Sequence, residues 1–119
     1  MAQIKNIKNM PPQKIWLDDV RPAPKGYFHA WNYDSAICLI EYFSRFGNGI
    51  ELISFDHDLG ERKSGYDVAK YIVENDIKIN RYKVHSANPV GRFNIEQLLD
   101  HYGYEMYTEP LCLEEEYFL

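Results

Sequence analysis

Short apolar runs alternate with segments of helical spacing along the whole chain, and this alternation restricts the fold more than any other feature. The apolar runs are short enough for buried strands, and the intervening segments repeat apolar residues at helical intervals. Strands that alternate with helices form mainly parallel sheets with helices on both faces. We therefore expect a three-layer α/β sandwich with five strands, at about 14–17, 27–31, 50–55, 81–85 and 104–107, and helices at about 34–46, 64–73 and 88–102.

The connection between the first two expected strands departs from a regular doubly wound fold. Only nine residues, Asp19 to Tyr27, separate these strands, and two of the nine are prolines. A parallel crossover connection needs about a dozen residues or more. We therefore expect the usual first helix to be missing, and the second strand to be antiparallel or to lie outside the sheet. Asp34 is placed to cap the helix that follows.

A length of 119 residues fits one domain, which we expect to span 1–119 with a polar lead-in at 1–12 and an acidic tail at 109–119. The tail holds four acidic residues and no basic one, whereas the preceding chain is close to neutral. An acidic end of this kind commonly keeps a protein soluble. Alternatively, the tail docks on the body through its apolar residues, which are Leu111, Leu113, Tyr117 and Phe118.

Composition restricts the partners and the compartment. The formal net charge of -5 argues against binding along extended nucleic acid, which needs clustered Lys and Arg. No apolar run reaches the ~18 residues of a membrane span, and residues 1–13 lack the apolar stretch of a signal peptide. Cys38 and Cys112 form neither a metal motif nor a disulfide framework, so we expect reduced thiols in a cytoplasmic protein.

Polar side chains gather where three of the expected strands end. In an open parallel sheet, ligands bind at the carboxyl ends of the strands, so neighbouring strands would bring these clusters together at one rim. The clusters are Asp18, Asp19 and Arg21 after the first strand; Asp56, His57 and Asp58 after the third; and His85, Ser86 and Asn88 after the fourth.

The residue types in these clusters predict phosphate chemistry. Several carboxylates that lie close together need raised pKa values or a divalent cation. Oxygen ligands without sulfur suit Mg²⁺ or Mn²⁺, which hold phosphate oxygens and activate water. Arg21, Ser86 and the amides that follow Asn88 suit the other phosphate oxygens. His57 and His85 are candidate proton carriers near neutral pH.

Each of these residues also has an ordinary structural explanation. Asp18 can end a strand and cap a turn, and Asn88 can serve only as a helix cap. His85 alone is more often a packed histidine than a ligand, and strict strand alternation would point His57 away from Asp56. The coincidence of the three clusters, rather than any single residue, favours a functional site.

The order of these clusters resembles the receiver domain of two-component signalling. That resemblance implies a flavodoxin-like fold, a phosphate-accepting Asp56, and Mg²⁺ held by Asp19, Asp56 and the carbonyl of Asp58. The chain departs from the receiver pattern in two places. The helix after the first strand is missing, and Glu109-Pro110 stands where receivers carry Lys-Pro.

Four motifs occur in order along the chain: WLDDVRPAP at 16–24, SFDHDLG at 54–60, GYDVA at 65–69 and VHSANPVGR at 84–92. Together they are similar to the divergent group of cyclic-phosphate processing receiver domains. This resemblance implies an enzyme that processes cyclic phosphates at RNA ends, in the context of RNA repair. The tail after residue 110 lies outside the similarity.

The leading hypothesis is a metal-dependent phosphoesterase that opens or removes a terminal cyclic phosphate on an RNA end or a small cyclic nucleotide. Asp56 either holds the metal or attacks phosphorus as a nucleophile. The alternatives are a phosphoacceptor receiver and a non-catalytic module that binds a metal or a nucleotide. The expected residues are Asp18, Asp19, Asp56 and Asp58 for the metal, Asp56, His57 and His85 for catalysis, and Arg21, Ser86, Asn88 and Arg92 for the substrate.

Overall fold

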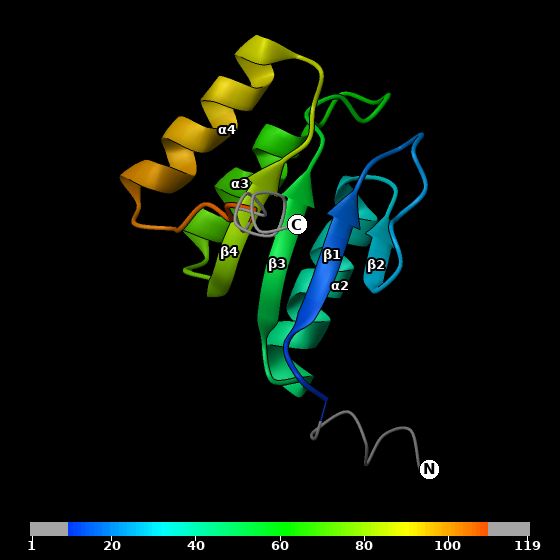
Figure 1. The fold of residues 1–119 in the computed structure, drawn as a ribbon, viewed down its shortest axis with the longest axis vertical. Helices are drawn as coiled ribbons and strands as arrows, with labels where there is room; N and C mark the ends of the chain where they lie inside the picture. Colours follow the sequence, from blue (N-terminus) through cyan, green and yellow to red (C-terminus); the bar gives the residue numbers. More distant parts are fainter. Residues whose placement is uncertain (1–9, 110–119) are drawn as a thin grey trace, which may run out of the picture.

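Four parallel strands form the sheet of the structure, a computed structural model that describes residues 10–109. The strand order is β2-β1-β3-β4, as Figure 1 shows. The expected docking contacts of the acidic tail lie outside the described residues. The elements are β1 (Gln13–Leu17), β2 (Tyr27–Ala30), α2 (Tyr33–Phe46), β3 (Ile50–Phe55), α3 (Gly65–Glu74), β4 (Ile79–Val84) and α4 (Pro89–His101). Within the described part, no helix is long and apolar enough to cross a membrane.

The second strand is parallel to β1, so the expectation of an antiparallel or detached strand is wrong. Lys14 pairs with Tyr27, and Leu17 pairs with Ala30. The pairing covers only about 13 Å of strand, because four residues rise by roughly 3.3 Å each. Residues 18–26 return over this short distance as loop and turn. The longer minimum length applies to crossovers that carry a helix.

The expected fifth strand is reduced to a single parallel bridge at Tyr82. The Tyr82 N–H donates to the Glu105 carbonyl at 2.9 Å, and the Tyr107 N–H donates to the Tyr82 carbonyl at 2.7 Å. The ladder does not extend back toward α4, because the Tyr104 N–H donates instead to the Leu99 carbonyl near the end of that helix. The described sheet therefore has four strands rather than five.

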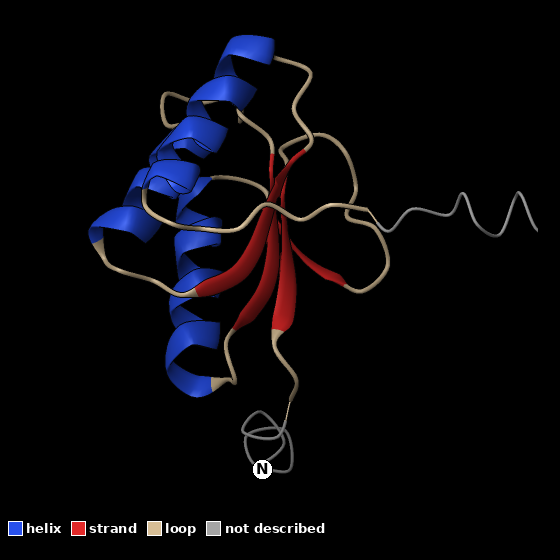
Figure 2. Cartoon of the chain, turned by 60° about the vertical axis from the view of Figure 1, so that its left-hand side comes forward, coloured by secondary structure: helices blue, strands red, loops and turns tan. Residues whose placement is uncertain are grey.

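All three described helices lie on one face of the sheet, as Figure 2 shows. Residues 10–109 thus form two layers, a sheet and a helical layer, where the sequence predicts three. The connection at 18–26, which would start a helical layer on the other face of a regular fold, is a loop here. The consequence is that one face of the sheet carries no helix from the described residues.

The hydrophobic core fills the space between the sheet and the helices. Ile15 and Leu17 of β1 and Phe55 of β3 are wholly inaccessible to solvent and belong to the main core cluster. Because side chains alternate along a strand, Trp16 and Ser54 point to the helix-free face. One face of β1 and β3 therefore packs against the helices. The other face carries Trp16 and Ser54, which contact the polar residues described below.

The start of α2 differs from the sequence expectation by two residues. Asn32 caps this helix and accepts a hydrogen bond from the Ser35 N–H at 2.8 Å, so the expected cap at Asp34 is wrong. Ser35 bonds back to the Asn32 backbone, which completes a reciprocal capping box with serine in the third position. At α4 the expected cap is confirmed, because the Asn88 side chain accepts from the Gly91 N–H at 3.0 Å.

Candidate functional site

The carboxyl ends of β1, β3 and β4 meet at one rim of the sheet. The backbone ladder continues one residue past the strands, because the Asp56 N–H donates to the Leu17 carbonyl and the His85 N–H donates to the Phe55 carbonyl, both at 2.9 Å. A cleft of about 440 Å³ lies at this rim. Its lining comes from all three strand ends: Asp18, Asp19, Val20, Arg21, Asp56, Asp58, Gly60, Ser86, Ala87 and Asn88.

Asp18 is fully buried, and its acceptor capacity is used up. Its Oδ1 accepts the backbone N–H groups of Val20 and Arg21, both at 2.8 Å. Its Oδ2 lies 2.9 Å from Arg21 Nε and 3.0 Å from His85 Nε2. A carboxylate offers about four lone-pair sites, so all are occupied. Burial acts to raise the pKa of Asp18, but the hydrogen bonds from Arg21, Val20 and His85 outweigh it and lower that pKa below its usual value.

His85 is held by contacts to both ring nitrogens and to one ring face. Nε2 contacts Asp18, and Nδ1 lies 2.8 Å from the Ser54 hydroxyl oxygen. The ring stacks on the Trp16 indole, with centroids 3.7 Å apart and planes 4° apart. Burial lowers the pKa of His85 and outweighs the opposing effect of Asp18. The neutral ring therefore donates from Nε2 to Asp18 and accepts from Ser54 at Nδ1.

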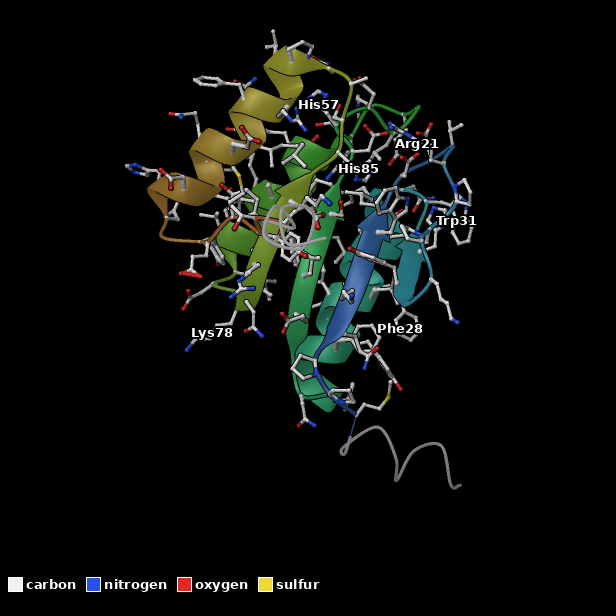
Figure 3. The ribbon with its side chains drawn as sticks, in the orientation of Figure 1. Arg21, Phe28, Trp31, His57, Lys78 and His85 are labelled. Carbon is white, nitrogen blue, oxygen red and sulfur yellow. The ribbon has the colours of Figure 1, made fainter. Side chains whose placement is uncertain are left out.

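The Arg21 guanidinium lies between two buried carboxylates. Its Nε pairs with Asp18, and its Nη2 lies 3.6 Å from Asp56 Oδ2. The Trp16 indole N–H donates to the Arg21 carbonyl at 3.1 Å, which anchors the loop that carries the guanidinium. Figure 3 shows Arg21 and His85 at the same end of the sheet. We call Asp18, Arg21 and His85 the paired half of the site.

Asp19, Asp56 and Asp58 form what we call the open half of the site. Asp19 makes no hydrogen bond or ion pair with another residue in the described range 10–109, and its Oδ2 lies against the Gly60 backbone. Asp56 uses Oδ1 to accept the His57 N–H at 2.8 Å. Asp58 is exposed, and a hydrogen bond from the His57 ring lowers the pKa of Asp58. Oxygen atoms of this half remain available to a ligand.

Ser86 and Asn88 bring the start of α4 to the cleft. The buried Ser86 hydroxyl accepts the Asn88 N–H at 3.0 Å, which leaves its own hydrogen free to donate. Asn88 caps α4 through Oδ1, and its Nδ2 lies 3.3 Å from Asp58 Oδ2. Asn88 therefore joins the helix cap that the sequence predicts to the open half of the site.

His57 and Arg92 lie outside the cleft lining. The His57 ring packs against α4, where a Cβ added to Gly91 would come within 2.3 Å of the ring. The Arg92 Nη2 donates to the Val84 carbonyl at 2.8 Å, and its Nε lies 3.8 Å from Glu96. The structure thus places these two beside α4 and His85 behind the lining residue Asp18. The other expected site residues line the cleft: Asp18, Asp19, Arg21, Asp56, Asp58, Ser86 and Asn88.

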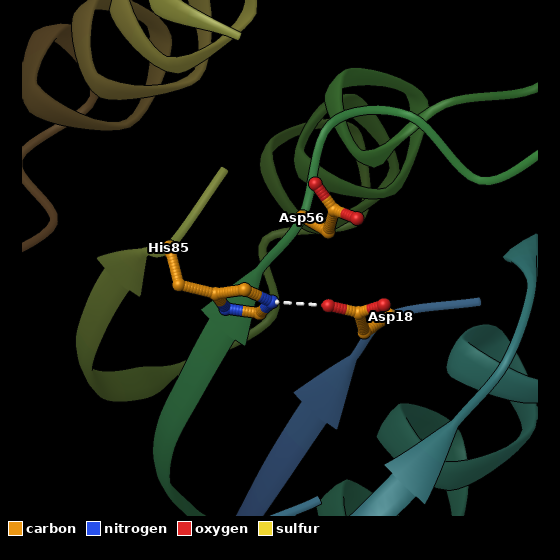
Figure 4. A group of neighbouring side chains, drawn as sticks. All are labelled: Asp18, Asp56 and His85. Carbon is orange, nitrogen blue, oxygen red and sulfur yellow. Dashed lines mark hydrogen bonds and ion pairs between the residues drawn. The ribbon is translucent and has the colours of Figure 1, made fainter. Parts of the chain in front are cut away.

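The donor set fits a hard divalent cation on the open half better than on the paired half. Asp18, Asp56 and His85 place one ligand atom each within 4.8 Å of one another (Figure 4). Asp18 and His85 are already bonded to each other and to Arg21 and Ser54, however, so they have no free lone pair. Asp19 has two carboxylate oxygens without a hydrogen bond in the described range, and Asp56 keeps unused lone pairs beside its contacts with His57 and Arg21. Oxygen ligands of this kind suit Mg²⁺ or Mn²⁺.

Sequence reasoning missed two residues that hold the paired half in place. Ser54 stands level with Trp16 in the register between β3 and β1. Its short side chain lets Trp16 from β1 and His85 from the end of β4 stack above β3. The only hint in the sequence is that Ser54 is a polar residue at the otherwise apolar end of β3. This hint points to a contact with Trp16 and His85 only once the strand order is known.

Comparisons with known proteins identify the family. A search of curated proteins found no match. The sequence pattern of the cyclic-phosphate processing receiver domain matches residues 13–101. This range contains every described strand and helix and all residues of the cleft lining. The protein therefore belongs to the cyclic-phosphate processing receiver domain family, as its four ordered motifs predict.

Proposed function

We propose that the protein is a metal-dependent phosphoesterase that opens a terminal cyclic phosphate on an RNA end or a small cyclic nucleotide, as a step in RNA repair. The observation that carries the proposal is the open half of the site. Two carboxylates with unused lone pairs, Asp19 and Asp56, share one cleft with the Ser86 hydroxyl. A cleft of about 440 Å³ suits one terminal nucleotide rather than an extended strand.

Asp19 and Asp56 would hold Mg²⁺ or Mn²⁺, with Asp58 beside them. When bound, the cation would offset the carboxylate charge and polarise a phosphate oxygen. Asp18 would act differently, because its oxygens are already engaged: it would keep Arg21 and the neighbouring histidine in position. This division deepens the sequence hypothesis, which treats all four aspartates as equivalent ligands.

The chain's own residues would bind and orient the phosphate. Ser86 can donate its free hydroxyl hydrogen, and Arg21 presents a cation that is half exposed at the cleft. Hydrolysis adds a water oxygen to phosphorus and breaks one ester bond of the ring, and the leaving ribose oxygen takes up a proton. The attacking water can supply this proton, because both ring nitrogens of His85 are bonded to Asp18 and Ser54 and His57 lies outside the cleft lining.

A short RNA that ends in a cyclic phosphate tests the proposal. With the full chain and Mg²⁺ or Mn²⁺, mass spectrometry should show addition of one water to the RNA end, and EDTA should stop it. Asp56→Asn should slow the reaction by about 100-fold or more. Asp100→Asn, an exposed aspartate on α4, is the matched control and should keep the full rate.

Four outcomes separate the proposal from its alternatives. Turnover that disappears in Asp56→Asn supports the phosphoesterase. Full turnover in that variant overturns the assigned role of Asp56. An unchanged RNA, together with a phosphoaspartate at Asp56 after exposure to a small phosphodonor, indicates a signalling receiver. An unchanged RNA with metal binding and no such adduct indicates a non-catalytic binding module.

A further inference from the structure

The helix-free face of the sheet carries an aromatic and basic surface. Trp16 and Tyr27 meet edge to face there, with ring centroids 5.8 Å apart. The Lys14 ammonium lies 5.1 Å from the Tyr27 ring centroid, and the Lys83 ammonium lies 5.6 Å from that of Tyr107. The helices within residues 10–109 lie on the other side of the sheet, as Figure 2 shows. In a parallel α/β sheet both faces are ordinarily covered, so this face needs a partner.

The last described residues, up to Glu109, contact this face of the sheet. Glu109 forms an ion pair with Lys83 at 2.9 Å, and Glu105 lies 4.0 Å from Arg81. Arg81 and Lys83 are two positions apart in β4 and so point to the same face. The bridge at Tyr82 fixes the backbone of this segment against β4. Residue 109 is therefore tied to the β4 side of the helix-free face.

The sequence beyond this point has the composition of a covering segment. Residues 110–119 combine apolar and aromatic residues, among them Leu111, Leu113, Tyr117 and Phe118, with three consecutive glutamates at 114–116. Ten residues span about 33 Å when extended, whereas the distance from β4 to β2 across the sheet is about 15 Å. The segment is long enough to cross the whole face from Glu109. Its glutamates complement Lys14, whose ammonium lies over Tyr27 on the far side.

We propose that residues 110–119 pack on the helix-free face and supply the layer that the first helix would supply in a regular fold. The apolar side chains cover Trp16 and Tyr27, and the glutamate run lies near Lys14. The packed tail would support the Trp16 ring on which His85 stacks. This proposal does not depend on the phosphoesterase reaction, since it concerns a different surface of the sheet.

A nucleic acid strand fits this face less well. Two of its cations, Arg81 and Lys83, are already paired with glutamates of the same chain. One face of the Trp16 ring is occupied by His85 and its edge by Tyr27, so no free stacking platform is left on that side. Charge and ring contacts therefore favour the tail of this chain as the occupant.

Tryptophan fluorescence tests the proposal in two single-tryptophan proteins. In Trp31→Phe, the emission reports Trp16 alone. A chain that ends at Glu109 should show a red shift and at least about a twofold increase in acrylamide quenching relative to the full-length Trp31→Phe protein. In Trp16→Phe, the emission reports Trp31, which is exposed beyond β2, and the same truncation should leave it unchanged. Equal quenching of Trp16 with and without the tail would overturn the proposal.

A disulfide trap keeps the proposal testable if truncation unfolds the protein. In a Cys38→Ser full-length chain, Lys14→Cys should form an intramolecular disulfide with the native Cys112. The matched control, Lys70→Cys, places a thiol on the exposed side of α3 and should not react with Cys112. Dimers linked between chains would show that a second copy covers the face and would overturn the intramolecular packing. If Lys14→Cys forms no disulfide with Cys112, the proposed packing is also overturned.

Discussion

Asp18 and Asp19 have the same side chain and adjacent positions, but they lie in opposite halves of the site. Asp18 is completely buried. It accepts hydrogen bonds from the backbone N–H groups of Val20 and Arg21 and from the side chains of Arg21 and His85. Asp19 is partly exposed and bonds to none of the other described residues. The comparison shows that a cluster of carboxylates need not act as one unit: the paired half builds the rim, and the open half is left to bind.

The largest expected difference between the halves is in stability. Asp18→Ala would remove the shared acceptor of two backbone N–H groups and of the Arg21 and His85 side chains. The free energy of unfolding should therefore fall by about 3 kcal/mol. Asp19→Ala removes no such contact and should change it by less than about 0.5 kcal/mol. Urea unfolding followed by circular dichroism measures both. Equal losses for the two variants would contradict the division into halves.

The second expected effect is on metal affinity and comes from the positive charge of the Arg21 side chain in the paired half. The Arg21 guanidinium neutralises Asp56 from 3.6 Å, so it opposes binding of a divalent cation next to that carboxylate. Arg21→Gln should raise Mn²⁺ affinity by about three- to tenfold, a modest factor because Arg21 is half exposed. Isothermal titration gives this affinity, with Arg45→Gln on α2 as the control. Weaker binding in Arg21→Gln would show that the guanidinium supports the cation instead.

A smaller effect is expected from the glycine that borders the open half. Gly60 has a φ of +68°, and an added Cβ would lie 2.7 Å from Asp19 Oδ2. Gly60→Ala should therefore cost about 1 kcal/mol of stability and displace the Asp19 carboxylate. The control is Gly26→Ala, which is also at positive φ but has open space around its Cβ. If both variants lose equal stability and keep equal Mn²⁺ affinity, Gly60 does not position Asp19.

The smallest expected effect is a pH dependence of stability from His85. Burial lowers the folded-state pKa of His85 below its usual value near 6.5. The unfolded chain therefore binds the proton more readily, so this stability is complete above about pH 6.5 and is lost as the pH falls. Unfolding measured in EDTA from pH 8 to 5.5 should lose stability more steeply in the native protein than in His85→Asn. Parallel slopes would contradict the assignment.

The sequence predicts the parallel strands and the meeting of their ends because these depend on local patterns. The apolar run 50–55 and the cap at Asn88 are such patterns, and both appear in the structure. The orientation of β2 was not predictable from length alone, because the required length depends on how far the strands overlap. Four paired residues make a nine-residue return sufficient.

The difference between Asp18 and Asp19 could not be predicted from the sequence either. It depends on long-range partners, since His85 lies 67 positions from Asp18 and approaches it only through the strand order. The same holds for Ser54, whose short side chain matters only because Trp16 and His85 stand on either side of it. Residue types indicated the chemistry of the rim. Which carboxylates are engaged by other residues and which stay open to a ligand depends on the tertiary contacts.

One titration tests most directly whether the open half is the ligand-binding half. Mn²⁺ affinity is measured for Asp19→Asn and Asp18→Asn, two isosteric changes at adjacent positions, after circular dichroism has confirmed that both proteins are folded. We expect Asp19→Asn to weaken binding by about tenfold or more, a loss of roughly 1.4 kcal/mol, and Asp18→Asn to change it by less than about threefold. Loss of binding in Asp18→Asn with full binding in Asp19→Asn would show that the paired half, not the open half, binds the cation.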